Sequence, residues 1–156
     1  MPDLILAESA DTYKAAAELF KEYAVHIEVD LGFQHFDDEL VSLNSMYAIP
    51  SGGIILCKND NEFIACVGIR KIDSTTAELK RMFVKPLHQH KGIGNLLMTR
   101  SIELARQRGY SVIRLDTLSH MTTAINLYKK YGFLEIAPYY FNPNANAKFF
   151  ELRIGP

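Results

Sequence analysis

Hydrophobic positions recur along the chain with two different periods, and the period predicts the type of each element. Apolar residues spaced three or four apart, as between Asp11 and Ile27, are typical of amphipathic helices, whereas short β-rich runs bounded by turn residues are typical of strands. The predicted strands cover residues 4–7, 53–58, 62–71, 77–85, 111–116, 134–140 and 148–154. The predicted helices cover residues 11–27, 37–43, 92–108 and 121–131.

The helix ends carry their own signals. Ser9 or Asp11 can cap the first helix, because a side-chain oxygen there can accept a hydrogen bond from the first free N–H groups. Gly109 and Gly132 are expected to take the left-handed conformation that ends a helix. Phe133, directly after Gly132, can then pack back on the last turn.

The order of these elements predicts a mixed sheet. One strand is followed by helices, three antiparallel strands, a helix, a strand, a helix and two final strands, with a hairpin turn at Asn59-Asp60-Asn61. The strand–helix–strand segment from Ala77 to Asp116 requires a right-handed parallel crossover. We therefore expect an α/β fold in which parallel and antiparallel strands share one sheet.

Length and composition indicate one globular domain. The chain has 156 residues, of which 48% are hydrophobic and 22% charged, so we expect a single domain over 1–156 with its own core. Its longest apolar stretches are far shorter than the roughly 20 residues that span a bilayer. The first residues carry no basic segment followed by an apolar one, so we expect a cytoplasmic protein that does not interact with a membrane.

Neither the cysteines nor the histidines indicate a metal site. Cys57 and Cys66 are too few for a disulfide framework, and we expect them to be reduced core residues, with a redox role open only if they face each other across the hairpin. His88 and His90 sit in one loop without a metal-like arrangement of further ligands, and no metal is expected.

Charge is distributed unevenly along the chain. Residues 1–78 hold 14 acidic and 5 basic residues (−9), whereas residues 79–156 hold 4 acidic and 12 basic residues (+8). A basic half suits a polyanionic ligand and an acidic half a cationic one, although the same counts describe an ordinary solvated surface. Nucleic-acid binding is not supported, because the basic half has no interleaved aromatic and basic stretch and the isoelectric point is near 6.5.

The segment Gln89-His90-Lys91-Gly92-Ile93-Gly94 is the strongest local signal for a ligand. It lies between a strand and a long helix, whose first N–H groups have no acceptor within the helix. Glycines let the backbone approach a ligand closely, so a phosphate or pyrophosphate is the expected guest. A Walker loop is excluded, because no Gly-x-x-x-x-Gly-Lys-Ser/Thr occurs.

Two other interpretations of this loop stay open. A dinucleotide-binding fingerprint is suggested by Asp116, 22 residues after Gly94, but Leu97 replaces its third glycine. Eight positions also separate Val84 from Gly92, where that fingerprint turns sharply from strand to helix. Alternatively, the glycines serve only tight packing at the start of a helix.

Three motifs together resemble the GNAT superfamily of N-acetyltransferases. They are Glu78-Leu79-Lys80-Arg81-Met82-Phe83-Val84, then Gln89-x-x-Gly92-x-Gly94, and then Ala124-x-x-Leu127-Tyr128-x-x-x-Gly132-Phe133. A bacterial group within that family is similar also in Leu115-Asp116-Thr117-Leu118 and in Tyr140-x-Asn142-Pro143. The resemblance implies the GNAT fold, a central and mostly antiparallel sheet with one splayed parallel strand pair, flanked by about four helices.

The resemblance also implies acetyl-CoA as co-substrate, with its pantetheine arm in the wedge between the splayed strands. The N–H of Met82 is then the candidate donor to the thioester oxygen, Val84 would pair with a pantetheine amide, and Lys85 or Lys91 could add charge near the phosphates. The cofactor-binding residues implied in this way are Met82, Phe83, Val84, Gln89, His90, Lys91, Gly92, Ile93, Gly94, Asn95, Asn126 and Tyr128.

Two side chains match the acid–base positions of the family. Glu78, eleven residues before Gln89, is the implied general base, acting through water, and Tyr128 is the implied general acid for the CoA thiolate. Glu78 could instead be a surface residue paired with Lys80 or Arg81. Tyr128 could instead be a core aromatic.

The sequence departs from the family at Met121, where many members carry an asparagine that contacts the cofactor arm; Ser119 or Asn126 could substitute. Because Cys57 and Cys66 match no nucleophile position, we expect direct attack in a ternary complex. A CoA-binding module without catalysis is the alternative.

The acceptor is expected to be a primary amine, on a small molecule or on a lysine or peptide. Family acceptor sites are built from the first helices and the connection between the last strands, which here hold Tyr139, Tyr140, Asn142 and a group of acids. Those acids favour a cationic amine, which could be a polyamine, an amino sugar or a lysine side chain. They are Glu28, Asp30, Asp37, Asp38 and Glu39. A homodimer is possible, as in many members of the family.

Overall fold

The computed structural model describes residues 2–28 and 30–155. Its strands are β1 (Asp3–Leu6), β2 (Gly53–Asn59), β3 (Glu62–Lys71), β4 (Thr76–Val84), β5 (Val112–Leu118), β6 (Leu134–Ile136) and β7 (Ala147–Arg153). Its α-helices are α1 (Ala10–Ile27), α2 (Phe36–Leu40), α3 (Leu43–Met46), α4 (Ile93–Gln107) and α5 (Thr122–Lys130). Short 3₁₀ turns cover Gly32–Gln34 and Pro86–His88.

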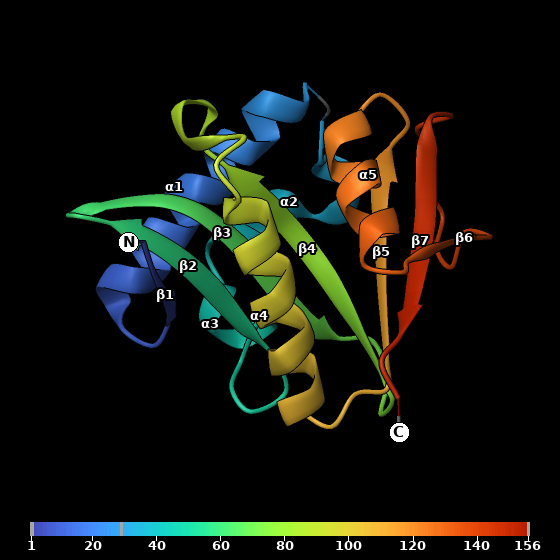
Figure 1. The fold of residues 1–156 in the computed structure, drawn as a ribbon, viewed down its shortest axis with the longest axis horizontal. Coiled ribbons are helices and arrows are strands. Elements are labelled where there is room, and N and C mark those ends of the chain that lie inside the picture. Colours follow the sequence, from blue (N-terminus) through green and yellow to red (C-terminus); the bar gives the residue numbers. More distant parts are fainter. Residues whose placement is uncertain (1, 29, 156) are drawn as a thin grey trace.

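The strands form one mixed sheet with the order β1-β2-β3-β4-β5-β7-β6. The pairs β1–β2, β2–β3, β3–β4, β5–β7 and β6–β7 are antiparallel, whereas β4 and β5 are parallel, as the crossover through α4 predicts. The parallel register joins only Thr76, Ala77 and Glu78 to β5. Beyond Glu78 the two strands diverge, so they lie side by side at one end and apart at the other (Figure 1).

A β-bulge interrupts β4 shortly after the strands diverge. Cys66 pairs with Phe83 and Gly68 with Lys80, so two residues of β4, Arg81 and Met82, stand opposite one residue of β3. Arg81 has a φ of 60°, in the left-handed region that non-glycine residues rarely adopt. The bulge places both Lys80 and Arg81 among side chains of the first helices, as their contacts with Gln34 and Glu39 show.

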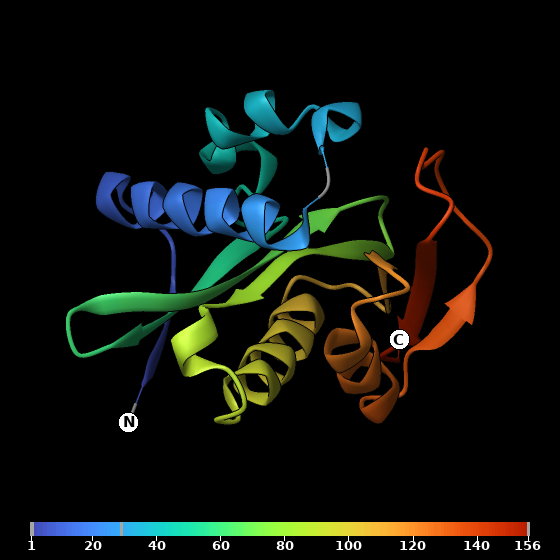
Figure 2. The same cartoon turned by 90° about the horizontal axis from the view of Figure 1, so that it is seen from above.

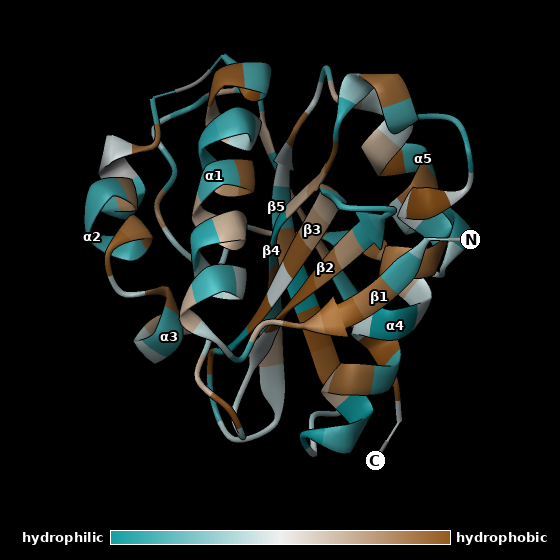
Figure 3. Ribbon diagram, turned by 90° about the vertical axis from the view of Figure 1, so that its left-hand side faces the viewer, coloured by the Kyte–Doolittle hydropathy of each residue, from teal (hydrophilic) through white to brown (hydrophobic). Residues whose placement is uncertain are grey.

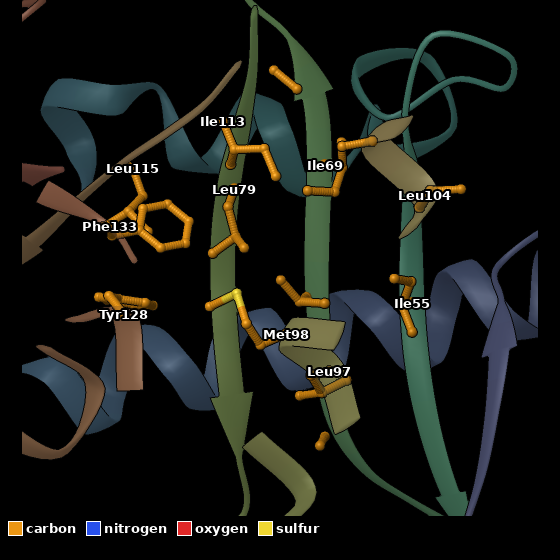
Figure 4. Packing of buried hydrophobic residues seen from close by; sticks show 14 of the residues in the cluster. Ile55, Ile69, Leu79, Leu97, Met98, Leu104, Ile113, Leu115, Tyr128 and Phe133 are labelled. Carbon is orange, nitrogen blue, oxygen red and sulfur yellow. The ribbon is translucent and has the colours of Figure 1, made fainter. Parts of the chain in front are cut away.

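Helices cover both faces of the sheet. Figure 2 shows α1, α2 and α3 on one face and α4 and α5 on the other, and Figure 3 shows the apolar strands between them. The larger core lies between the sheet and α4 and α5, where Leu79, Leu97 and Phe133 are almost fully buried (Figure 4). The second core lies under α1 and α3 and includes Phe20 and Tyr47.

A buried ion pair crosses this second core. The Arg81 guanidinium donates to both carboxylate oxygens of Glu39, at 3.1 Å and 2.9 Å, and neither residue exposes more than 5% of its surface. The Tyr47 hydroxyl donates to the same carboxylate at 2.9 Å. Burial alone would raise the pKa of Glu39, but the hydrogen bonds and charge of Arg81 outweigh it and lower that pKa. The pair therefore ties α2 to the bulge.

The predicted helix ends agree with the structure. Ser9 caps α1, accepting from the Thr12 N–H while the Thr12 hydroxyl accepts from the Ser9 N–H. Gly109 and Gly132 have φ values of 90° and 96°, in the left-handed region. The Phe133 N–H bonds back to the Tyr128 carbonyl at 3.1 Å, which closes α5.

Two predicted elements were wrong in extent. The single helix predicted over 37–43 is two short helices, α2 and α3, because the chain turns at Val41 and Ser42. The strand predicted over 134–140 ends at Ile136, since Pro138 cannot donate to a ladder. The residues after it turn back over the sheet, which carries Tyr139 and Tyr140 toward β4 and β5.

The cysteines are not paired. Cys57 stands opposite Ala65, and Cys66 stands opposite Leu56, so the two are near each other in the hairpin. Their side chains belong to different cores on opposite faces of the sheet, because successive side chains of a strand alternate. Both are buried free thiols, as expected for core residues.

Across residues 2–28 and 30–155, no helix is long and apolar enough to cross a membrane. The same residues contain no group of three or more His, Cys, Asp or Glu side chains arranged to hold a metal ion.

Candidate active site

A cleft of about 600 Å³ opens where β4 and β5 separate. Its floor is the end of β4, and its sides come from the loop before α4, the start of α4, and α5. The first helix contributes Tyr23, His26 and Ile27 at one edge. The remaining lining residues are Met82, Phe83, Val84, His88, Gln89, His90, Gly92, Ile93, Gly94, Asn95, His120, Met121, Thr122, Thr123, Ala124, Asn126, Leu127 and Lys130.

The end of β4 offers backbone donors to this cleft. The Lys85 amide donates to the Ile64 carbonyl of β3 at 2.9 Å. Because amides along a regular strand point alternately to its two edges, the amide of Val84 points the other way, where β5 has diverged. This amide needs a partner that the sheet does not supply.

The start of α4 offers a second set of donors. Gly92 caps the helix with a φ of 84° and no side-chain hydrogen bond, so the amides of the first turn have no acceptor within the helix. A β-carbon on Gly94 would lie 3.3 Å from the end of the Leu127 side chain, so the glycine allows α4 and α5 to pack closely here. Nearby, the Gln89 side chain donates to the Val84 carbonyl at 2.9 Å and holds the loop against β4.

The basic residues around the cleft differ from those expected. Lys85 is paired with Glu62 at 3.2 Å and with Glu22 at 3.7 Å, on the opposite side of its loop. Lys91 is exposed and lies outside the lining of the cleft. Lys130 does line it and donates to the side-chain oxygen of Asn95, in the first turn of α4, at 2.8 Å.

A smaller cavity of about 70 Å³ adjoins the cleft. By the volume that one water needs, it would hold roughly five waters, which is the size of a small polar molecule. Met82, Met121 and Ala124 line both spaces, so the two meet beside the bulge of β4. The other lining residues are Tyr23, Ile27, Leu31, Gln34, Leu79, Lys80, Arg81, Asp116, Thr117, Leu118, Tyr128, Asn142 and Asn144.

Glu78 lies behind the wall of this cavity and is 4% exposed, so it is no surface residue. Its carboxylate accepts from the Tyr139 hydroxyl at 2.6 Å. It also lies 3.3 Å from Arg70 Nε and 3.8 Å from Lys80 Nζ. Burial, followed by the charge of Glu78, raises the pKa of Tyr139, so its phenol keeps the proton that it donates.

Tyr128 combines a packing role with a place at the cavity. Its ring lies 5.8 Å from that of Phe133 and 6.3 Å from that of Phe150, within the core (Figure 4). It also lines the small cavity across from Asp116 and Met82. Burial raises the pKa of Tyr128, and the charges of Tyr23 and Asp116 raise it further, so the hydroxyl stays protonated in ordinary buffers.

Asp116 and Lys80 line the same cavity and are joined by a chain of hydrogen bonds. The Lys80 ammonium donates to the Gln34 side-chain oxygen at 3.3 Å, and the Gln34 amide donates to the Tyr140 hydroxyl at 2.8 Å. Tyr140 in turn donates to Asp116, which also accepts from Asn142 at 3.3 Å. Burial and then the Arg81 charge lower the pKa of Lys80.

The family model described as "Acetyltransferase (GNAT) family" matches residues 13–133. This chain belongs to that family. An uncharacterized N-acetyltransferase from Schizosaccharomyces pombe is 32% identical, with 96% of this chain and 91% of the relative covered. Another, from Dictyostelium discoideum, is 31% identical, with 87% and 92% covered.

Solved GNAT structures share the fold. A GNAT family acetyltransferase from Staphylococcus aureus superposes with a TM-score of 0.82 at 20% identity, with 99% of each chain covered. One from Elizabethkingia anophelis, solved with acetyl-CoA bound, superposes with a TM-score of 0.68 at 20% identity, with 97% of each chain covered. The expected GNAT fold is thus confirmed, as is the enzyme class of N-acetyltransferases.

The GNAT motifs located most of the cleft but not all of it. Tyr23, His26 and Ile27 were missed because α1 reaches the cleft by packing across β4, which no local spacing reveals. His120 and Lys130 were missed because no motif singles them out. The sequence suggests Asp116 as a ribose-binding acid and as part of a motif shared with a bacterial GNAT group, whereas its place in the small cavity depends on the splay of β5.

The acids expected to attract a cationic acceptor do not gather in the cavity. Glu39 is neutralised by Arg81, and Asp30 accepts from the Gly32 amide at 2.8 Å. Glu28, Asp37 and Asp38 are exposed and lie outside the lining of either space. Glu39 is the buried acid of this group, and a buried carboxylate usually has a cation paired with it, as Arg81 is here. The preference for a cationic acceptor stays a prediction.

Proposed function

We propose that this GNAT member transfers an acetyl group from acetyl-CoA to a primary amine by direct attack in a ternary complex, with residues 1–156 acting as one acetyltransferase domain. The observation that carries the proposal is the junction of two spaces at Met82. The cleft along the end of β4 and the small cavity beside it share Met82 in their linings.

The residues of the cleft suit acetyl-CoA. Its pyrophosphate would lie on the first amides of α4, where the left-handed Gly92 leaves the backbone open. Lys130 supplies positive charge beside those amides. The pantetheine arm of acetyl-CoA would accept hydrogen bonds from the amides of Met82 and Val84, because β5 no longer pairs with this part of β4. Met121, Ala124 and Leu127 give this part of the cleft an apolar side.

Acetyl-CoA supplies an acetyl group as a thioester, whose carbonyl gains negative charge when an amine attacks it. The Met82 amide would donate a hydrogen bond to that oxygen, acting as an oxyanion donor. The bulge fixes this amide, because the Arg81 side chain next to it is held in the second core by Glu39. A donor that needs no rearrangement during the reaction is the effective kind.

The attacking amine must also lose a proton, and Glu78 is our candidate acceptor. It lines neither space, so it would act through water. Tyr128 would give its proton to the departing thiolate. Its raised pKa keeps the phenol protonated until that step.

Direct attack is supported by the placement of the cysteines. Cys57 and Cys66 are fully buried within β2 and β3 and line neither space. Burial, followed by the charge of Glu22, raises the pKa of Cys66 and favours its unreactive thiol form. An acetylated cysteine intermediate therefore has no support among the described residues.

The first experiment is the thermal shift with acetyl-CoA, CoA and NAD compared side by side. A ligand at 100 times its Kd adds about 2.7 kcal/mol to the free energy of unfolding. Stabilisation by acetyl-CoA and CoA alone is expected. Stabilisation by NAD alone, or by none of the three, would overturn the proposed cofactor.

The second experiment measures thiol release from acetyl-CoA with a panel of amines, for wild type and Glu78→Gln. We expect turnover with at least one primary amine, and a loss of about 10²–10⁴-fold in the variant with unchanged CoA affinity. CoA affinity without thiol release for any amine would identify a binding module instead.

A further inference from the structure

The small cavity presents charges of both signs to the acceptor. Lys80 and Asp116 line it directly, and Arg81 lines it while paired with Glu39. Together with Glu78 and Arg70 behind the wall, the ionisable groups are three cations and three carboxylates. A polycation would therefore meet no net negative charge here.

The Lys80 ammonium has room for another acceptor. It is 9% exposed, and across residues 2–28 and 30–155 its hydrogen bond is the one to Gln34, at 3.3 Å. Glu78 lies farther away, at 3.8 Å. An ammonium carries three N–H donors, so at least one points to no protein acceptor among these residues. A buried cation facing a cavity is costly unless an anion joins it.

The Asp116 carboxylate can likewise accept a further hydrogen bond. Both hydrogen bonds recorded for its carboxylate, from Tyr140 and from Asn142, end on Oδ2. Its Oδ1 has no donor in the part of the chain that the structure describes. An ionised carboxylate can accept on both oxygens, so Oδ1 can receive an N–H from a molecule in the cavity.

We propose that the acceptor is a small amino acid, with its amino group on the Asp116 side of the cavity and its carboxylate on Lys80. This deepens the proposed acetyl transfer and rests on it. Gln34 lies between the two ends and holds the Lys80 side chain, while Asn142 and Asn144 offer neutral hydrogen-bond partners. The volume of about 70 Å³ limits the acceptor to a few non-hydrogen atoms inside the cavity.

The test compares matched acceptors with the wild-type enzyme. Alanine is compared with alaninamide and ethylamine, and β-alanine with propylamine, while putrescine and spermidine represent polycations. We expect kcat/KM for each amino acid to exceed that of its analogue without the carboxylate by about tenfold or more. This is the factor expected when a charge-assisted hydrogen bond is removed. Preference for the polyamines or for the simple amines would overturn this inference and leave the acetyl transfer standing.

A variant series locates the preference. Lys80→Met should raise KM for the amino acids by about tenfold or more, with little effect on the simple amines, and Lys80→Arg should restore part of the loss. Lys129→Met, at an exposed position of α5, is the matched control and should change nothing. Thermal melting and acetyl-CoA affinity report whether Lys80→Met remains folded.

The outcomes separate the two proposals. An equal loss for amino acids and simple amines in Lys80→Met would assign Lys80 a structural role and overturn the amino-acid inference. If the protein melts normally but none of the amines supports thiol release, the proposed function is overturned, and this inference with it.

Discussion

At the scale of single residues, the site depends on where one hydroxyl group lies. Tyr128 packs with Phe133 and Phe150 as a core aromatic would, and it also lines the small cavity. The ring is therefore part of the fold, whereas only the hydroxyl serves the proposed chemistry. A substitution that removes the hydroxyl and keeps the ring separates the two roles.

We expect Tyr128→Phe to lower kcat by about 10²–10⁴-fold with little change in melting temperature or acetyl-CoA affinity. The control is Tyr110→Phe, which removes a hydroxyl bonded to the Ser51 carbonyl far along the sheet. That variant should lose stability and keep its kcat. Steady-state kinetics and thermal melting distinguish these results, and an unaltered kcat in Tyr128→Phe would contradict the role of proton donor.

The sequence predicted these residues unequally. Glu78, Met82 and Tyr128 could be named because each belongs to a motif with fixed spacing. Of the partners of Glu78, Lys80 could be named from the sequence. Arg70 and Tyr139 could not, because they come from another strand and a loop and meet Glu78 only after the sheet has formed. Lys80 and Asp116 could not be predicted to line one cavity either, because they are 36 positions apart on two strands that diverge.

At the scale of elements, the pair Glu39–Arg81 joins a five-residue helix to the bulge of the central strand. A helix this short has little stability of its own, so tertiary contacts must hold it. The folded-state pKa of Glu39 is lowered, which means that the pair stabilises the fold above the ordinary pKa of a glutamate. This stabilisation is lost as the pH falls through the lowered value.

Glu39→Gln should therefore lower the free energy of unfolding by about 3–5 kcal/mol at pH 7, because it leaves Arg81 buried without its counter-charge. The difference from wild type should shrink as the pH falls below 4.5, where Glu39 begins to bind a proton in the unfolded chain, and should keep shrinking as the pH falls through the lowered pKa of the folded state. Urea unfolding at several pH values measures this. Glu135→Gln, on an exposed ion pair with Lys148, should cost at most about 1 kcal/mol.

The start of α4 gives a second element-scale prediction. Gly92 and Gly109 have φ values of 84° and 90°, and a β-carbon on either would meet no atom within 4 Å. Gly92→Ala and Gly109→Ala should therefore cost similar stability, of order 1–2 kcal/mol, through backbone strain alone. Only Gly92→Ala should also weaken acetyl-CoA binding, measured by calorimetry. Equal affinities in the two variants would argue against a phosphate site at α4.

Element prediction succeeded where one period or one residue type decides the structure. The long helices and the central strands follow from their apolar spacing, and Ser9, Gly109 and Gly132 mark helix ends by their own chemistry. The short helices after α1 failed because pieces of four or five residues are defined by what they pack against. The bulge at Arg81 also has no local signal, since it is held by Glu39, 42 residues away.

At the scale of the molecule, the sheet is two antiparallel halves joined by a parallel register of three residues. Strands β1–β4 and strands β5–β7 would be linked more firmly by a ligand lying between β4 and β5. CoA should therefore slow hydrogen exchange at the Met82 and Val84 amides, with the Lys85 amide, already bonded to Ile64, as an internal control. Equal protection with and without CoA would argue that these amides face elsewhere.

The hydrogen bond between Gln34 and Tyr140 joins residues that are 106 positions apart, so segments from both ends of the chain meet at the small cavity. Most of the cleft is encoded by residues 82–130, and Tyr23 and Ile27 line both spaces, whereas Asn142 and Asn144 line the small cavity alone. Under the proposed function, a substitution at either asparagine would alter the acceptor half of the site and leave the lining of the cofactor half unchanged.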